Sequence, residues 1–352
     1  MPASELVSVP MISDTRPPAT IPSAAPQGQN LPWPTGTIPL MLAPMQGLTN
    51  RAMRALFAEQ FKPDVLFSEF VRVKASSKKN ISSNDLQEIR SPDNGTPLVI
   101  QLIGNQLDAL LPAAATAQNL GVAHLNINLG CPYGRMNNNA AGGGLLRKPD
   151  ELAAILHALR SAVRGGFSVK VRAGFDNPDQ LFPLLPLFEE CGIDFLILHA
   201  RTVAQRYSGE ADHRITARVV RSTRLPVIAN GDIFTAAEGK RVLDQTGAAG
   251  LMLGRGAISD PWLFERIRGN HPPYSNGVER QAELHDYLSA LLARYEILFC
   301  GEHQILCKIK GVVAFIHDQE LANPLHRLLK CKALDRFREL LGEFAKTHPT
   351  IR

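Results

Sequence analysis

Short apolar segments alternate with longer amphipathic segments along most of the chain. Nearly continuous apolar runs such as LVIQL, FLILH and PVIAN are typical of parallel strands covered on both faces, and the stretches between them have the 3.6-residue period of helices. Eight such runs are present, and each is predicted to be a strand. They occupy residues 39–43, 64–68, 97–103, 124–129, 167–171, 194–199, 225–229 and 249–253.

Eight strand–helix units over about 230 residues are the size of a (β/α)8 barrel, that is, a TIM barrel in the α/β class. A doubly wound open sheet is the competing interpretation, because eight strands can also lie flat. Polar residues and glycines cluster immediately after the strands. That distribution favours the barrel, whose active sites lie at the carboxyl ends of its strands.

The pattern divides the chain into three parts. Residues 1–36 are rich in Pro, Ala, Ser and Thr and predict a flexible tail, with Leu31 and Trp33 held against the body of the protein. Residues 37–270 form the predicted barrel. The helix breakers of the segment 271–277 mark a boundary, after which residues 271–352 predict a small all-helical domain with helices over 279–299, 303–317 and 325–344.

Composition excludes several classes. With 45% hydrophobic and 20% charged residues, the chain is neither fibrous nor wholly disordered. Its five cysteines show no C-x-x-C pair and no metal-ligand spacing, so we expect no metal site and a reducing compartment, the cytoplasm. No apolar run approaches the roughly 20 residues of a membrane span, and we expect a monomer with no membrane partner. The net charge of +5 permits a polyanionic partner without requiring one.

Candidate chemistry begins at the end of the fourth predicted strand, with Asn-Ile-Asn-Leu-Gly-Cys-Pro at 126–132. A lone cysteine is usually a small buried hydrophobic residue. Here Gly130 and Pro132 turn the chain directly around Cys131, which places the thiol at the mouth of the barrel. This favours a reactive group over a packing residue.

Two cations follow at the end of the fifth strand. Lys170 and Arg172 lie on one side of that strand, because side chains alternate with a period of two. If that side faces the interior, the two charges need an anionic or electron-rich partner. The alternative is an ion pair with a barrel carboxylate such as Glu69.

The last two strands indicate a phosphate site. Asn230-Gly231-Asp232 follows the seventh strand and Gly254-Arg255-Gly256 the eighth, and loops at these two positions of a barrel commonly bind phosphate. Gln101 and the segment Pro44-Met45-Gln46 add amide and thioether groups. The set suits a flat heterocycle that bears a phosphate, and FMN is the natural candidate.

These motifs together resemble the tRNA-dihydrouridine synthase family, in order, over about residues 38–345. The matching segments are Ala-Pro-Met at 43–45, N-x-N-x-G-C-P at 126–132, V-K-V-R at 169–172, H-A-R-T at 199–202, N-G-D-I at 230–233 and G-R-G at 254–256. The segment Glu-Phe-Val-Arg-Val at 69–73 further resembles the subgroup C enzymes, which act on uridine 16 in the tRNA D-loop.

The resemblance implies an enzyme that reduces the C5=C6 bond of a D-loop uridine to 5,6-dihydrouridine. NADPH would reduce FMN, the reduced flavin would give hydride to C6, and Cys131 would give a proton to C5. The implied FMN residues are Pro44, Met45, Gln46, Gln101, Lys170, His199, Asn230, Gly231, Asp232, Gly254 and Arg255.

The same resemblance implies a tRNA partner, gripped in part by the helical domain. Seven cations lie between Lys308 and Arg338, although solvated helix faces are the plainer interpretation of such charges. The implied RNA contacts are Arg72, Asn128, Arg172, Tyr207, Lys308 and Lys310. The chain departs from the family pattern at Asn126, where Asp is usual, at Ala200, where Gly is frequent, and in the segment 133–137.

Two alternatives remain at this stage. One is an FMN-dependent barrel that oxidises or reduces a small pyrimidine, like a dihydroorotate dehydrogenase, which leaves the basic helical extension without a role. The other is a catalytically silent RNA-binding barrel. The presence of Cys131 together with Lys170 and His199 argues against the silent form.

Overall fold

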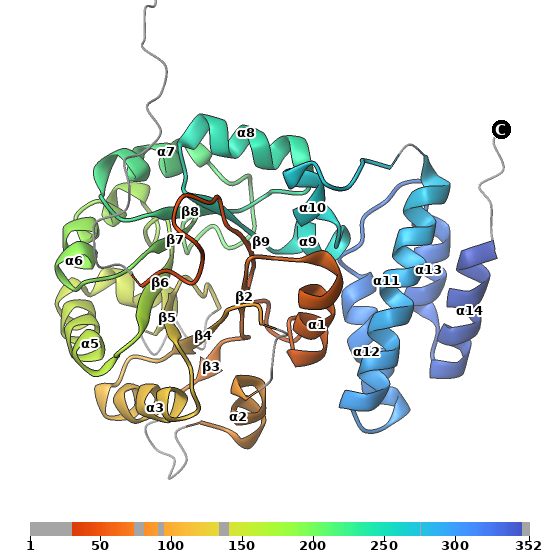
Figure 1. Cartoon of the computed structure of the whole chain (residues 1–352), viewed down its shortest axis with the longest axis horizontal. Helices are drawn as coiled ribbons and strands as arrows, with labels where there is room; N and C mark the ends of the chain where they lie inside the picture. Colours follow the sequence, from red (N-terminus) through yellow and green to blue (C-terminus); the bar gives the residue numbers. More distant parts are fainter. Residues whose placement is uncertain (1–29, 74–80, 91–94, 134–140, 275, 347–352) are drawn as a thin grey trace, which may run out of the picture.

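The protein consists of a barrel of parallel strands with four further helices packed on one side of it (Figure 1). The computed structural model describes residues 30–73, 81–90, 95–133, 141–274 and 276–346. Of the predicted tail, residues 1–36, the structure describes only residues 30–36. Its described end is fixed to the body as expected, because Trp33 is buried and packs edge-to-face on Phe195 with ring centroids 4.9 Å apart.

The eight predicted strands are all present and form a closed barrel. They pair in parallel in the order β2-β1-β9-β8-β7-β6-β5-β4, and a pairing between β2 and β4 closes the ring, which excludes the open sheet. A two-residue strand, β3 (Val71–Arg72), extends the β4 side and was not predicted, being too short to show a pattern. The barrel strands are β1 (Leu40–Leu42), β2 (Val65–Phe67), β4 (Leu98–Ile103), β5 (His124–Leu129), β6 (Gly166–Arg172), β7 (Leu196–His199), β8 (Val227–Asn230) and β9 (Gly250–Leu253).

Alternation along the strands separates the outer apolar layer from the barrel interior. In β6, Phe167, Val169 and Val171 join the apolar cluster beneath the surrounding helices, so Ser168, Lys170 and Arg172 face the other way. This confirms the expected shared side of Lys170 and Arg172. The lower interior is apolar, and its buried residues include Trp33, Met41, Phe67, Val99, Phe195, Ile197, Ile228 and Met252.

Helices surround the barrel between successive strands (Figure 1). Asn50 caps the first of them, and a capping box of Thr235 with Glu238 begins α8. The helices are α1 (Arg51–Leu56) with η1 (Phe57–Phe61), α2 (Ser83–Ile89), α3 (Leu107–Asn119), η2 (Gly142–Arg147), α5 (Pro149–Ala162), η3 (Pro178–Leu181), α6 (Leu184–Glu190), α7 (His213–Ser222), α8 (Ala236–Thr246), α9 (Arg255–Ser259) and α10 (Leu263–Arg268).

Four helices follow the linker, α11 (Gly277–Leu298), α12 (Glu302–Val313), α13 (Ala322–Lys330) and α14 (Leu334–Lys346). The single helix predicted over 325–344 is wrong: it is two helices, because Cys331 is extended at φ −61° and ψ 150°. The turn lets Leu328 of α13 and Phe337 of α14 enter the same core. Among the helices in the described ranges, none is long and apolar enough to cross a membrane.

The four helices share an apolar core with the barrel. One buried cluster runs from Met53 and Phe57 beside the barrel to Leu288, Val312 and Phe337 in the helices. In Figure 1, α11 and α12 lie next to α1. The predicted division at residue 270 falls in the linker after α10, and the independence of the helical part stays a prediction.

Candidate active site

A pocket opens at the carboxyl ends of the strands and encloses about 550 Å³ of space free of protein atoms, part of it open to solvent. Nine of the eleven residues expected to hold the cofactor line it: Pro44, Met45, Lys170, His199, Asn230, Gly231, Asp232, Gly254 and Arg255. Of the other two, Gln46 is exposed and Gln101 is fully buried.

Asp232 organises the charges on one side of the pocket. Its carboxylate accepts two hydrogen bonds from Arg201, at 2.9 and 2.6 Å, and one from Arg255 at 2.7 Å. The backbone N–H of Ala211 adds a fourth at 2.8 Å. Burial opposes the charge, but the bonds from Arg201 and Ala211 hold the pKa of Asp232 below its usual value. Two cations and one carboxylate leave the group with a net positive charge.

The backbone at this point requires a glycine. Gly231 has φ 122°, and a Cβ on it would lie 2.8 Å from both Ala211 Cβ and His199 Cδ2. Asp232 follows with φ 49°, a left-handed conformation, which turns the chain toward the guanidinium groups of Arg201 and Arg255. The tight turn therefore places the carboxylate and leaves the glycine backbone open to the pocket.

His199 and Lys170 lie in the pocket as weakened bases. Burial, reinforced by Lys170 and Arg172, lowers the pKa of His199 well below its usual range, so the imidazole is neutral at pH 7. Burial, reinforced by Arg172, lowers the pKa of Lys170 to about 7. The Lys170 ammonium donates to Asn230 Oδ1 at 3.0 Å. The alternative partner Glu69 instead accepts from the N–H of Gly47.

Tyr207 lies over the rim of the pocket with 49% of its surface exposed. Its ring is 5.3 Å from the guanidinium carbon of Arg172 and 5.2 Å from that of Arg255. Arg172 also donates to the carbonyls of Thr202 and Arg206, which fixes the loop that carries Tyr207. Arg172 itself is 2% exposed. Its role as an RNA contact stays a prediction, and it bonds the backbone carbonyls of Gly130, Thr202 and Arg206.

Cys131 lies at the end of β5, buried, beside Ile103, Ala141 and the partly buried Phe70. Burial raises the pKa of the Cys131 thiol above its ordinary value, although Arg172 and Arg72 act against this rise. The thiol therefore keeps its proton at neutral pH. The turn around it is fixed from two sides, since Asn128 Oδ1 accepts from the N–H of Cys131 at 2.9 Å and Arg172 Nε donates to Gly130 O at 3.0 Å.

A chain of buried amides leads to the cysteine across three strands. Asn126 donates to Ser168 Oγ and accepts from Gln101 Nε2, each at 2.8 Å. Gln101 Oε1 accepts in turn from Asn128 Nδ2 at 2.8 Å. Every link is neutral, and Asn126, the departure from the family pattern, serves as both donor and acceptor. The sequence placed Gln101 and Asn128 at the site but did not predict this chain.

The remaining predicted RNA contacts have different surroundings. Arg72 on β3 is exposed. Lys308 and Lys310 on α12 are half-buried, and their ammonium groups donate to the carbonyls of Gly47 at 3.3 Å and Cys331 at 2.9 Å. Of the segment 133–137, which departs from the family pattern, only Tyr133 is among the described residues, and it is exposed.

Among the groups missed at the sequence level, one lies beside the pocket and one lines it. Arg201 is 2% exposed and bonds Asp232, and the alternation after His199 was a signal that could have found it. Phe234 lines the pocket with its ring 5.5 Å from the Arg255 guanidinium carbon. Within the described ranges, no three His, Cys, Asp or Glu side chains group as a metal site would require.

The fold and the pocket define a (β/α)8-barrel protein whose site lies at the strand ends. Solved structures agree on this fold. A histamine dehydrogenase from Rhizobium sp. 4-9 matches with a TM-score of 0.55 at 12% identity, covering 78% of this chain and 51% of that chain. The structure of TcOYE with pHBA matches with a TM-score of 0.51 at 12% identity, covering 72% of this chain and 93% of that chain. At such low identity the likeness concerns the fold alone.

Residues 41–304 match the family model described as dihydrouridine synthase, and the chain belongs to this family. It is therefore an enzyme of the tRNA-dihydrouridine synthase type, as the motifs predicted. A tRNA-dihydrouridine(16) synthase of Cupriavidus necator is 35% identical over 75% of this chain and 84% of its own length. A tRNA-dihydrouridine synthase B of Pseudomonas putida is 34% identical over 73% of this chain and 77% of its own length. Because similar relatives carry both names, they leave the subgroup open.

Proposed function

We propose that the protein reduces the C5=C6 bond of a uridine in the tRNA D-loop, using FMN held in the strand-end pocket and NADPH as reductant. The single observation that carries the proposal is the convergence of nine expected cofactor residues on one pocket. Family membership supports the reaction class. When bound and reduced by NADPH, the flavin would supply the hydride for C6 of the uracil ring.

The residues present fit a flavin phosphate and ring. Arg255 and Arg201, joined through Asp232, give the β8–β9 side a net positive charge that suits a phosphate. Gly231 leaves its backbone accessible where a Cβ would collide with His199. Lys170, with its pKa of about 7, can hold a proton opposite an electron-rich ring edge.

Cys131 supplies the proton for C5 in this proposal. Its buried thiol is protonated at neutral pH because its pKa is raised. Asn128 holds the backbone N–H of Cys131 and so orients the turn. A positioned acid of this kind contributes roughly 10²–10⁴-fold to a rate.

The RNA approaches over the exposed side chains at the rim, Tyr207 and Arg72. A uridine has to leave its stack to reach the pocket, and an aromatic rim residue offers a surface for an unstacked base. The segment 69–73 favours uridine 16 as the target, and a relative named for that position is 35% identical. We further propose that the protein acts in the cytoplasm. A tRNA substrate and five free cysteines agree with that location.

The test is a direct assay with two substrates. Purified protein with FMN and NADPH is given unmodified tRNA or free orotate, and dihydrouridine is mapped by position in the tRNA. Reduction in tRNA at position 16, with no turnover of orotate, is the expected result. Turnover of orotate alone would establish the small-pyrimidine alternative, and modification at another D-loop position would overturn only the assignment to uridine 16.

A further inference from the structure

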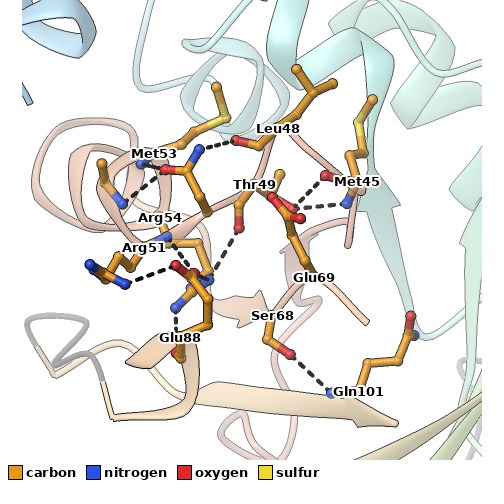
Figure 2. Close-up of polar contacts among 12 residues, drawn as sticks. Met45, Leu48, Thr49, Arg51, Met53, Arg54, Ser68, Glu69, Glu88 and Gln101 are labelled. Atoms are coloured by element: carbon orange, nitrogen blue, oxygen red, sulfur yellow. Dashed lines mark hydrogen bonds and ion pairs between the residues drawn. The ribbon is translucent and has the colours of Figure 1, made fainter. Parts of the chain in front are cut away.

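The loop between β1 and α1 carries Met45 into the pocket and is fixed by its own hydrogen bonds (Figure 2). Thr49 Oγ1 accepts from the N–H of Met45 at 2.8 Å and donates to Met45 O at 3.3 Å. The N–H groups of Leu48 and Thr49 also donate to Met45 O, each at 3.0 Å. The position of Met45 therefore depends on where the rest of this loop lies.

The peptide groups of Gly47, at the tip of the loop, are held from two directions. The N–H of Gly47 donates to Glu69 Oε2 at 2.8 Å, from the segment that follows β2. The carbonyl of Gly47 accepts from Lys308 Nζ at 3.3 Å, from α12 in the helical part. One support thus comes from the barrel and the other from 261 residues further along the chain.

Both supporting side chains are partly buried. Glu69 Oε1 is buried without a hydrogen-bond partner in the described chain, and burial raises the pKa of this carboxyl while Gly47 and Lys308 oppose the rise. Lys308 is half-buried, with its ammonium 5.4 Å from the centre of the Phe299 ring. A lysine enclosed in this way is a fixed support rather than a mobile surface cation.

The helical part makes two more contacts with the same loop. Asn50 Nδ2 donates to Leu48 O and lies 3.4 Å from the hydroxyl of Tyr295 on α11. The buried Leu48 side chain lies on α12, where a Cβ on Gly311 would be 3.7 Å from its Cδ2. The helices therefore form the outer wall of the loop that carries Met45.

We propose that Lys308 is a positioning residue, which holds the Gly47 peptide and thereby keeps Met45 in place in the cofactor pocket. The proposal rests on the proposed function in that FMN is the ligand of this pocket. It differs from the predicted role of Lys308, in which the ammonium contacts RNA. It also gives the helices a role in the cofactor site itself.

The test compares Lys308→Met with Lys310→Met, a matched change two residues along the same helix whose ammonium bonds Cys331 O, away from the loop. FMN affinity is measured by flavin fluorescence, and hydrogen–deuterium exchange is followed over 43–50 without FMN. We expect Lys308→Met to bind FMN about 5–10-fold more weakly, as for a lost charge-assisted bond of about 1–1.4 kcal/mol, and to exchange faster over 43–50. Lys310→Met is expected to match the wild type in both, and Lys308→Arg to restore both.

Each other outcome is decisive. Unchanged FMN affinity and exchange in Lys308→Met, with weaker tRNA binding, would overturn the proposal and establish the RNA contact. A wild-type protein that binds no FMN would refute the proposed function, and the exchange comparison would still decide whether Lys308 holds the loop. Equal thermal stability of the variants excludes general unfolding as the cause of faster exchange.

Discussion

Two sides of the barrel mouth are built from different chemistry, and the residues that line the pocket belong to the charged side and to the neighbouring strands β1 and β6. The side formed by β7, β8 and β9 is charged, with Asp232 bonded to Arg201 and Arg255. The side formed by β4 and β5 is neutral, with Gln101 and Asn128 linked by amide hydrogen bonds up to the turn of Cys131. The fixed charges of the first side suit a phosphate. A cation beside the Cys131 thiol would favour loss of its proton, whereas neutral amides do not.

The difference shows how one barrel can separate the proposed acid, Cys131, from the proposed phosphate site around Asp232. Arg172 is the described cation with hydrogen bonds to both sides, and it uses them on the carbonyls of Gly130, Thr202 and Arg206. Its effect on Cys131 is smaller than that of burial, which raises the pKa of the thiol. We expect the neutral side to keep this thiol protonated, as the proposed reaction requires.

The largest effect is expected on the neutral side. Cys131→Ala removes the proposed acid, so dihydrouridine formation should fall roughly 10²–10⁴-fold while FMN and tRNA binding stay within about twofold. Turnover is measured on unmodified tRNA. Cys300→Ala, which changes an exposed cysteine, is the control and should match the wild type. Equal turnover of Cys131→Ala and wild type would rule out this cysteine as the acid.

The next effect is expected on the charged side. Asp232→Ala leaves Arg201, 2% exposed, without its carboxylate, so the free energy of unfolding should fall by about 3 kcal/mol. Denaturation in urea measures the loss. Inorganic phosphate should restore part of it by binding beside the released guanidinium groups. Arg214→Ala, which breaks an exposed ion pair with Asp212, should leave stability nearly unchanged. An equal loss in both variants would contradict the role assigned to Asp232.

The smallest effect concerns Lys170, which lies between the two sides. Its pKa in the folded protein, about 7, is below the ordinary 10.5, so above pH 7 the unfolded chain binds more protons than the folded one. Stability attributable to this lysine should therefore rise between pH 7 and 9, by at most about 1.4 kcal/mol per pH unit. Urea denaturation of wild type and Lys170→Met measures it as a difference. A constant difference across this window would show that the pKa of Lys170 is not lowered.

The barrel could be predicted because each of its strands and helices is indicated by a pattern within its own short segment of sequence. All eight strands appear as apolar runs, and alternation correctly put Lys170 and Arg172 on the same side of their strand. The pocket residues on β7 to β9 could be predicted because glycines and charges directly after a strand can only lie at its carboxyl end. The closed ring follows from the number and length of these units.

The rest depends on contacts between distant segments. The sequence marks Arg172 as a cation but does not reveal that it bonds three carbonyls in two other loops. The amide chain through Gln101 depends on side-chain rotamers, which have no periodic signal. The break at Cys331 between α13 and α14 was missed because no Gly or Pro marks it, and the apolar period continues across it.

In the part of the chain that the structure describes, the lower interior of the barrel is apolar and holds Trp33 against Phe195, whereas the pocket lies at the opposite end, at the carboxyl ends of the strands. In the proposed reaction both NADPH and the tRNA would reach the pocket from this end of the barrel. We therefore expect the two substrates to bind alternately, each after the other has left. Slow release of the reduced tRNA would then delay the next catalytic cycle. In that case product release, as well as the chemical step, would set the turnover rate.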